Sequence, residues 1–294
     1  MKPAISYNPE TRSLFVQAGF GTNVSPETFE RKPINAGILI DISGSMGAED
    51  NTSKSRLEWA KEAVLATLDN LVEGQDYLTI TTFTNDAEQI WPVAGSNPRP
   101  VSAQDKKDIK KLIASIETQG STNLNEGLNL SYKLLAGVQK KLGSKKSDKF
   151  NHRLITITDA NLNVDPDEGG AVAQAEIMSE TRGIDLTVVG VGLNFFQKFV
   201  DKLTTMRGGN YIFAQNGQDM VEYFDAFDTL VTSFAYDFVA NLEFDESELE
   251  FVKAHGVPDT AAGDAIDTLV NIKTLFLTSS KNGGGARVLE FKVK

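Results

Sequence analysis

The chain contains the stretch Ile38-Leu39-Ile40-Asp41-Ile42-Ser43-Gly44-Ser45-Met46-Gly47, which decides the fold more than any other part of the sequence. It predicts a buried strand that ends on a carboxylate and then opens through glycines into a helix. Asp41, Ser43 and Ser45 alternate, so a turn at the strand end can direct all three side chains to one point. A carboxylate and two hydroxyls are hard oxygen ligands, which suit magnesium, manganese or calcium rather than zinc. The stretch therefore predicts a metal site with room for further ligands.

Strand-like and helix-like patterns alternate between residues 34 and 235. Repeated units of this kind predict an α/β fold, with a doubly wound, mostly parallel sheet and helices on both faces. The expected strands are Ile34–Asp41, Asp76–Phe83, an edge strand at Glu88–Val93, His152–Thr158, Ile184–Val191 and Asn210–Ala214. The expected helices are Ser53–Val72, Ala103–Ile116, Asn125–Leu142, Gly170–Arg182, Phe195–Met206 and Asp219–Ser233.

Two later residues are expected at the same edge of the sheet as Asp41. Asp159 ends the predicted strand that starts at His152, and Thr122 precedes the predicted helix that starts at Asn125. In parallel sheets, ligands bind outside the carboxyl ends of the strands, near the point where the strand order reverses. Asp41, Thr122 and Asp159 should therefore meet at one place.

Asp-x-Ser-x-Ser at the end of a hydrophobic strand resembles the metal-ion-dependent adhesion site of von Willebrand factor type A (vWA) domains, a Rossmann-like family. That family also uses a threonine before a helix and an aspartate after a later strand, which match Thr122 and Asp159. The resemblance covers roughly residues 34–235. It implies that one divalent cation is held, directly or through water, by Asp41, Ser43, Ser45, Thr122 and Asp159. Mg²⁺ is favoured, Mn²⁺ and Ca²⁺ also fit, and the carboxylate of a partner's Asp or Glu would complete the coordination.

One departure from the family pattern follows the last aspartate. Ala160 stands where the family usually has glycine, and a positive φ is costly for alanine. The next loop carries Asp165, Asp167 and Glu168. A solvated acidic turn is the simpler interpretation of these three side chains, and a second cation site is the alternative.

The motif residues also have a structural interpretation. Serine and aspartate often cap helices, so Asp41, Ser43 and Ser45 could form a capping turn after a strand. Thr122 taken alone would more often be a helix N-cap than a metal ligand. The presence of all three separated motifs in register favours the metal site over these alternatives.

The two ends of the chain differ from its centre, because strand patterns separated by Asn, Gly and Pro turns replace the helices there. Residues 1–33 and 236–294 therefore predict one small β-sandwich-like module, and several bacterial vWA proteins look similar. Its expected strands are Ala4–Tyr7, Ser13–Gly19, Val239–Phe244, Ile266–Leu277 and Arg287–Lys292.

Composition narrows the possible partners and settings. The 294 residues carry a formal net charge of −11, which disfavours nucleic acid and anionic lipid as partners. Cysteine is absent, so disulfides, thiol catalysis and cysteine-bound zinc are excluded. No apolar run reaches the length of about 18 residues that a membrane helix needs. The start of the chain has no signal-like region, so we expect a cytoplasmic protein if Met1 is the native start, and otherwise an exported one whose signal is missing.

The function we expect is non-enzymatic: metal-dependent binding of a protein, as an adhesion or adaptor module. An intracellular assembly subunit that works with an AAA+ ATPase or a metal chelatase is the alternative. A serine hydrolase is a remote third possibility, because Ser45, Asp159 and His255 follow the α/β-hydrolase order. However, Ser43 stands where the nucleophile elbow needs its first glycine, and His255 lies outside the α/β region.

Overall fold

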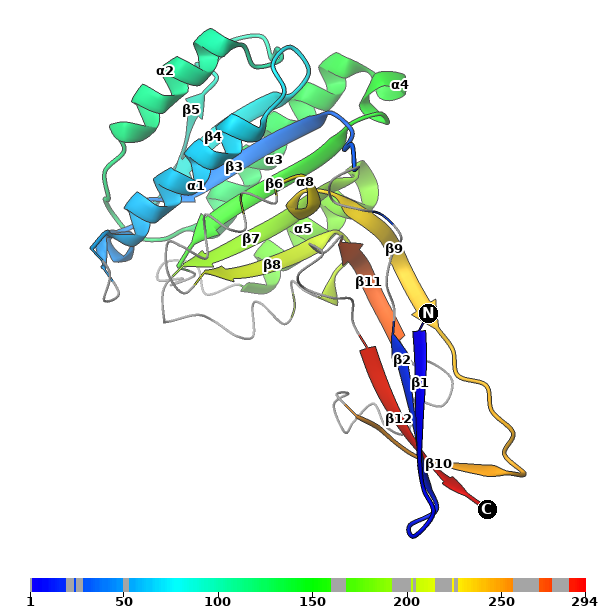
Figure 1. Cartoon of the computed structure of the whole chain (residues 1–294). Coiled ribbons are helices and arrows are strands. Elements are labelled where there is room, and N and C mark those ends of the chain that lie inside the picture. The colour runs from blue at the N-terminus through cyan, green and yellow to red at the C-terminus, as the bar shows by residue number, and fades with distance from the viewer. Residues whose placement is uncertain are drawn as a thin grey trace. The chain divides into compact units, whose positions relative to one another are not determined.

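The computed structural model of the chain divides into two compact units, Glu30–Thr232 and a second unit made of Met1–Phe29 with Ser233–Lys294 (Figure 1). The sequence-based boundaries were residues 34 and 235. The structure describes residues 2–19, 24, 29–49, 53–159, 168–191, 202, 205–214, 224, 227–255, 270–276 and 286–294.

A six-stranded sheet with the order β5-β4-β3-β6-β7-β8 forms the centre of the larger unit, as far as its described residues go (Figure 1). All neighbours pair in parallel except β5 with β4, which are antiparallel. Every residue of β3, β4 and β7 is buried, which their apolar and β-branched runs favour in a sheet covered on both faces. The predicted fold class is therefore confirmed. The strands are β3 (Ile34–Asp41), β4 (Tyr77–Phe83), β5 (Ala87–Trp91), β6 (Asn151–Thr158), β7 (Ile184–Val191) and β8 (Gly209–Ala214).

Helices cover both faces of this sheet (Figure 1). Alternate side chains of β3 point to opposite faces, so Ile38 and Ile40 join the core under α1 and α2, while Leu39 joins the core under α3 and α5. The long helices are α1 (Arg56–Asn70), α2 (Ala103–Ala114), α3 (Leu124–Leu142) and α5 (Glu168–Arg182). The short ones are the 3₁₀ turn η1 (Gly44–Gly47), α4 (Ser144–Ser147) and α8 (Phe227–Leu230).

Some predicted elements differ from the structure. α4 forms between the predicted helix Asn125–Leu142 and the predicted strand His152–Thr158, where no element was expected. The predicted helix Asp219–Ser233 is wrong at its end, because Ser233 starts strand β9 (Ser233–Ala240). The rest of that helix is described only at residue 224 and in α8, and most of the predicted helix Phe195–Met206 lies outside the described residues.

The smaller unit contains an antiparallel sheet of order β1-β2-β12-β10 and the antiparallel pair β11-β9. Side chains from both sheets share one core, in which the Phe291 ring meets the Phe244 and Phe251 rings edge-on at 5.1 and 5.6 Å. Beside β9, its strands are β1 (Lys2–Asn8), β2 (Ser13–Gly19), β10 (Leu249–His255), β11 (Val270–Phe276) and β12 (Ala286–Val293).

Two strands of the smaller unit were predicted poorly. β10 was not predicted, and the strand expected at Val239–Phe244 is wrong beyond Ala240, because the chain leaves the sheet there. In the described part of the chain, no helix has the length and hydropathy that crossing a bilayer requires.

Candidate metal centre

The central strand β3 lies between β4 and β6, so the direction in which strands are added reverses beside it. Asp41 is the last residue of β3, and Asp159 directly follows β6. The two carboxylates therefore leave neighbouring parallel strands at the same carboxyl edge. This is the position where doubly wound sheets bind their ligands.

Asp41 is fully buried, and hydrogen bonds hold its carboxylate. Its carboxylate accepts from the backbone N–H of Ser43 at 2.8 Å and from Oγ1 of Thr158 at 2.6 Å. Burial raises the pKa of Asp41 to about 6, although these hydrogen bonds oppose the shift, and the nearby charge of Asp159 adds to it. Among the described residues, no Lys or Arg forms an ion pair with this carboxylate.

The two serines of the motif face each other across the turn η1, with their Oγ atoms 3.1 Å apart. Ser43 occupies the N-cap position of η1, but its side chain makes no capping hydrogen bond. The Ser43 hydroxyl therefore does not act as a helix cap. Ser43 is buried and Ser45 is partly buried, so the pair runs from the interior toward solvent.

Backbone hydrogen bonds tie the loop before α3 to this turn. The N–H of Gly44 donates to the carbonyl of Gly120 at 3.2 Å, and the N–H of Gln119 donates to the carbonyl of Ile42 at 2.7 Å. Gly120 has φ of +68°, and a Cβ atom added there would lie 3.1 Å from Cβ of Thr84. Glycine therefore allows both the turn and its close approach to Thr84.

Thr122 lies in this loop with its side chain fully buried, and its Oγ1 atom has no hydrogen-bond partner among the described residues. It is not the N-cap of α3, because Asn123 takes that position and accepts from the N–H of Glu126. A buried hydroxyl without a partner costs free energy, so such groups are uncommon in native proteins. The Thr122 hydroxyl is therefore available to a ligand.

Asp159 is buried and forms an ion pair with Arg56, whose Nη1 lies 2.6 Å from Oδ2 of the carboxylate. Arg56 was not predicted as part of the site. The only signal was its place in the first turn of the predicted helix Ser53–Val72, and an arginine there is usually a surface residue. The structure thus adds a positive charge to the predicted group of ligands.

The side chains present fit a hard divalent cation. Nowhere in the described ranges do three or more His, Asp or Glu side chains gather in a metal-binding group. The predicted ligands are two carboxylates and three hydroxyls, and hydroxyl and carboxylate oxygens are ligands of magnesium and calcium. The buried Asp41 carboxylate without a cationic partner and the unpartnered hydroxyl of Thr122 are what such an ion would satisfy. The ligand roles of all five residues remain a prediction.

Residues 37–161 match the sequence profile of the von Willebrand factor type A domain family. This range contains all five predicted ligands. The chain contains a vWA domain. Domains of this family commonly bind proteins in a metal-dependent manner.

The relatives that the chain matches are much longer proteins, and the chain spans only a small part of each. The chain is 28% identical to the uncharacterized protein YfbK of Escherichia coli over 178 residues, which are 60% of this chain and 28% of YfbK. It is 30% identical to human inter-alpha-trypsin inhibitor heavy chain H3 over 144 residues, which are 48% of this chain and 14% of that protein. A solved vWA protein from Catenulispora acidiphila shares the fold, with a TM-score of 0.56 and 16% identity, over 96% of this chain and 61% of that one.

The remote hydrolase hypothesis required Ser45, Asp159 and His255 to act together. In the vWA domain, Asp159 contacts Arg56. His255 belongs to the other compact unit, where its Nε2 lies 3.0 Å from Oε2 of Glu290. These contacts do not favour a catalytic triad. Ala160, Asp165 and Asp167 lie outside the described residues, as does the side chain of Glu168.

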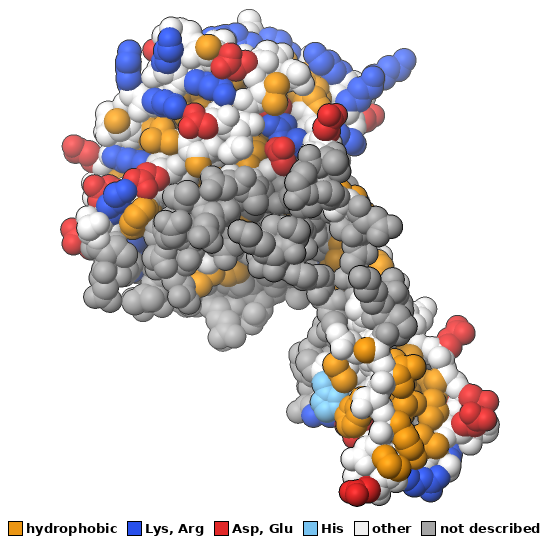
Figure 2. Space-filling view, in the orientation of Figure 1, with side chains coloured by type: hydrophobic (Ala, Val, Ile, Leu, Met, Phe, Trp, Pro, Cys, Tyr) orange, Lys and Arg blue, Asp and Glu red, His pale blue; other side chains and the backbone are white. Residues whose placement is uncertain are grey.

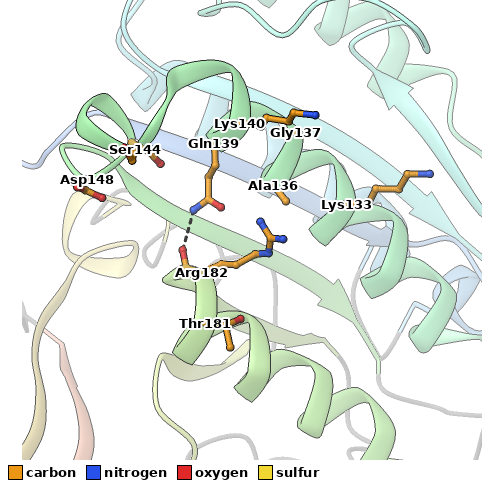
Figure 3. A pocket seen from close by; sticks show the side chains of 10 residues that line it. Lys133, Ala136, Gly137, Gln139, Lys140, Ser144, Asp148, Thr181 and Arg182 are labelled. Carbon is orange, nitrogen blue, oxygen red and sulfur yellow. Dashed lines mark hydrogen bonds between the residues drawn. The ribbon is translucent and has the colours of Figure 1, made fainter.

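A wide, open hollow of about 570 Å³ lies at the opposite edge of the vWA domain, between the ends of α3 and α5 (Figure 3). Lys133, Lys140 and Arg182 line it, and the side chain of Gln139 donates to the carbonyl of Arg182 at 2.9 Å. Basic side chains also gather over the end of the domain where α2 and α4 lie (Figure 2). The hollow is open and partly lined by basic side chains. It lies at the opposite edge of the sheet from the carboxyl ends of β3 and β6.

Proposed function

We propose that this vWA domain is a metal-dependent protein-binding module that holds one divalent cation at the carboxyl edge of β3 and β6. Mg²⁺ is the favoured ion, because carboxylate, hydroxyl and water oxygens are its usual ligands in proteins. The residues proposed to hold it are Asp41, Ser43, Ser45, Thr122 and Asp159.

The observation that carries this proposal is the buried Thr122 hydroxyl, which has no hydrogen-bond partner among the described residues. Backbone hydrogen bonds join the loop of Thr122 to the Asp-x-Ser-x-Ser turn. Asn123 already caps the helix, so Thr122 has no capping role, and its loop lies beside the turn that carries Ser43 and Ser45. A ligand role gives the Thr122 hydroxyl the partner that it otherwise lacks.

Each residue has a definite task in this proposal. The turn η1 presents Ser43 and Ser45 together, while the rigid, buried end of β3 fixes Asp41. When bound, the cation would supply an electrophilic coordination position for the carboxylate of an Asp or Glu side chain. The partner is therefore a protein that presents such a side chain at its surface. The proposed task is binding rather than catalysis.

Calorimetric titration of chelator-stripped protein with Mg²⁺, Mn²⁺ and Ca²⁺ tests this function. The Asp41→Asn variant removes one charge at the site, and Asp69→Asn removes the same charge from an exposed position on α1 that pairs with Lys110. We expect one cation to bind the wild type and Asp69→Asn, and this binding to be lost in Asp41→Asn. Equal, weak binding in all three proteins would mean that only the acidic surface attracts cations, and the proposal would be wrong.

A further inference from the structure

Arg56 places a permanent positive charge among the proposed ligands. Its Nη1 atom donates to Oδ2 of Asp159 at 2.6 Å and lies 3.4 Å from the backbone carbonyl of Ser45. The side chains of Arg56 and Asp159 are 9% and 1% exposed, so water screens this ion pair weakly. The guanidinium therefore lies between one proposed ligand and the backbone of another.

The local structure holds Arg56 in this position. Ser55 is the N-cap of α1 and forms a capping box with Glu58, so the first turn of the helix is well defined. The backbone N–H of Arg56 donates to the carbonyl of Ala48, just after the turn η1. The start of α1 is thereby fastened to the motif turn, and the side chain of Arg56 is directed to Asp159.

Among the described side chains of the proposed site, negative charges outnumber positive ones. Asp41 and Asp159 supply two buried carboxylates, and Arg56 supplies one positive charge that contacts Asp159. Removing one partner of a buried ion pair leaves an uncompensated charge, which strongly destabilises a fold. A divalent cation bound between the same carboxylates would provide that compensation, but it would also be repelled by the guanidinium.

We propose that Arg56 is a built-in counter-charge that sets the cation affinity of the site. This inference rests on the proposed metal-binding function. Arg56 keeps Asp159 compensated when no cation is bound, so the domain stays folded in that state. It also lowers the affinity for the cation, and the negative charge of an arriving partner carboxylate offsets this repulsion. The site therefore favours cation and partner carboxylate together over the cation alone.

A purely structural ion pair predicts the opposite effect on the metal. If Arg56 only positions Asp159 as a ligand, its removal would loosen that side chain and weaken cation binding. If Arg56 opposes the cation, its removal would strengthen binding although the metal-free protein becomes less stable. The sign of the affinity change therefore separates the two roles.

The test is calorimetric titration of chelator-stripped wild type, Arg56→Gln, Arg56→Lys and Arg99→Gln with Mg²⁺, together with thermal melts in chelator and in Mg²⁺. Arg99→Gln is the matched control, because it removes the same charge from an exposed arginine that pairs with the buried Asp105, outside the proposed site. We expect Arg56→Gln to melt earlier in chelator, to bind Mg²⁺ about tenfold more tightly or better, and to recover its melting temperature in Mg²⁺. Arg56→Lys, which keeps the positive charge, should bind Mg²⁺ more weakly than Arg56→Gln does, and Arg99→Gln should bind as the wild type does.

Each other outcome has a definite meaning. Equal or weaker Mg²⁺ binding by Arg56→Gln, beside normal binding by the wild type, would overturn the inference and leave the proposed function intact. An Arg56→Gln protein that stays unfolded at every Mg²⁺ concentration would also overturn it, since the cation should replace the lost charge. If Arg56→Gln bound Mg²⁺ and the wild type did not, the inference would be supported and the proposed function of the native chain would be overturned. Folded proteins that never bind would overturn both.

Discussion

The hydroxyl of Thr158, the last residue of β6, donates a 2.6 Å hydrogen bond to Oδ2 of Asp41, the last residue of the neighbouring strand β3. This bond joins the two strand ends from which the proposed carboxylate ligands emerge. It also supports the charged form of Asp41, whose pKa burial raises. Thr158 was not predicted as part of the site, although it is adjacent to Asp159.

Replacing Thr158 should cost stability through the loss of this bond. We expect Thr158→Val to lower the free energy of unfolding by about 2 kcal/mol near neutral pH, because a buried carboxylate loses a donor. Thr156→Val is the matched control two residues earlier on β6, since Oγ1 of Thr156 is buried and has no hydrogen-bond partner. That variant should be neutral or slightly stabilised. Urea denaturation in chelator measures both, and equal losses in the two variants would contradict the role of Thr158.

Thr122 offers a test that separates a ligand from a structural residue. Its hydroxyl has no partner within the fold, so Thr122→Val should leave the metal-stripped protein as stable as the wild type or stabilise it by about 1 kcal/mol. The same variant should bind Mg²⁺ at least about tenfold more weakly, while Thr122→Ser keeps the binding. Denaturation in chelator and titration with Mg²⁺ provide the two readouts. A destabilised Thr122→Val protein with normal Mg²⁺ affinity would show that the hydroxyl is structural.

The stability of the metal-stripped protein should depend on the ionisation of Asp41. The folded-state pKa is about 6 and the unfolded value is near 3.8, so the folded state binds the proton more tightly. Stability therefore falls as the pH rises from the lower value through the higher one. Asp41→Asn removes this penalty and should be more stable than the wild type at about pH 7.5, by on the order of 2 kcal/mol.

The comparison is made by denaturation in chelator at several pH values. The advantage of Asp41→Asn should shrink by about half on acidification to about pH 5, where much of the wild-type carboxyl is already protonated in the folded state. The pH dependence of this difference is the test. An advantage that stays constant, or that grows as the pH falls, would contradict the burial effect on Asp41.

Gly120 should tolerate a side chain poorly. Alanine there would adopt a positive φ and bring Cβ close to Thr84, so Gly120→Ala should lower the free energy of unfolding by about 1–2 kcal/mol and weaken Mg²⁺ binding. Gly137→Ala is the control: Gly137 lies within α3, and a Cβ atom there would have open space around it. That change should stabilise the protein by about 0.5–1 kcal/mol. Denaturation curves of both variants are compared, and two similar effects would argue against the close turn at Gly120.

Much of the α/β unit could be predicted because its signals are local. The apolar run that ends in Asp41 can be recognised as a strand from its own residues. The alternation of strands and helices along the chain then predicts a parallel sheet. The position of Asp159 beside Asp41 also followed from the rule that parallel strand ends meet at one edge. These inferences depend on backbone geometry that the sequence pattern determines directly.

Arg56 and β10 could not be predicted, because their environments are made by distant residues. Arg56 lies 103 residues from Asp159 in the chain, and nothing near it in sequence marks it as buried. β10 carries several charged residues, and an irregularity between Phe251 and Lys253 interrupts its alternation. Its one buried position, Ala254, becomes apparent only when β12 lies beside it.

The central claim is that the carboxyl edge of β3 and β6 holds one divalent cation. Anomalous diffraction from crystals of the protein grown with Mn²⁺ tests this directly, because the manganese signal locates the ion without assumptions about its ligands. We expect one strong peak within coordination distance of the oxygens of Ser43 and Ser45, with Asp41, Thr122 and Asp159 around it. Well-ordered crystals with no peak there, or with peaks only among exposed acidic side chains, would contradict it.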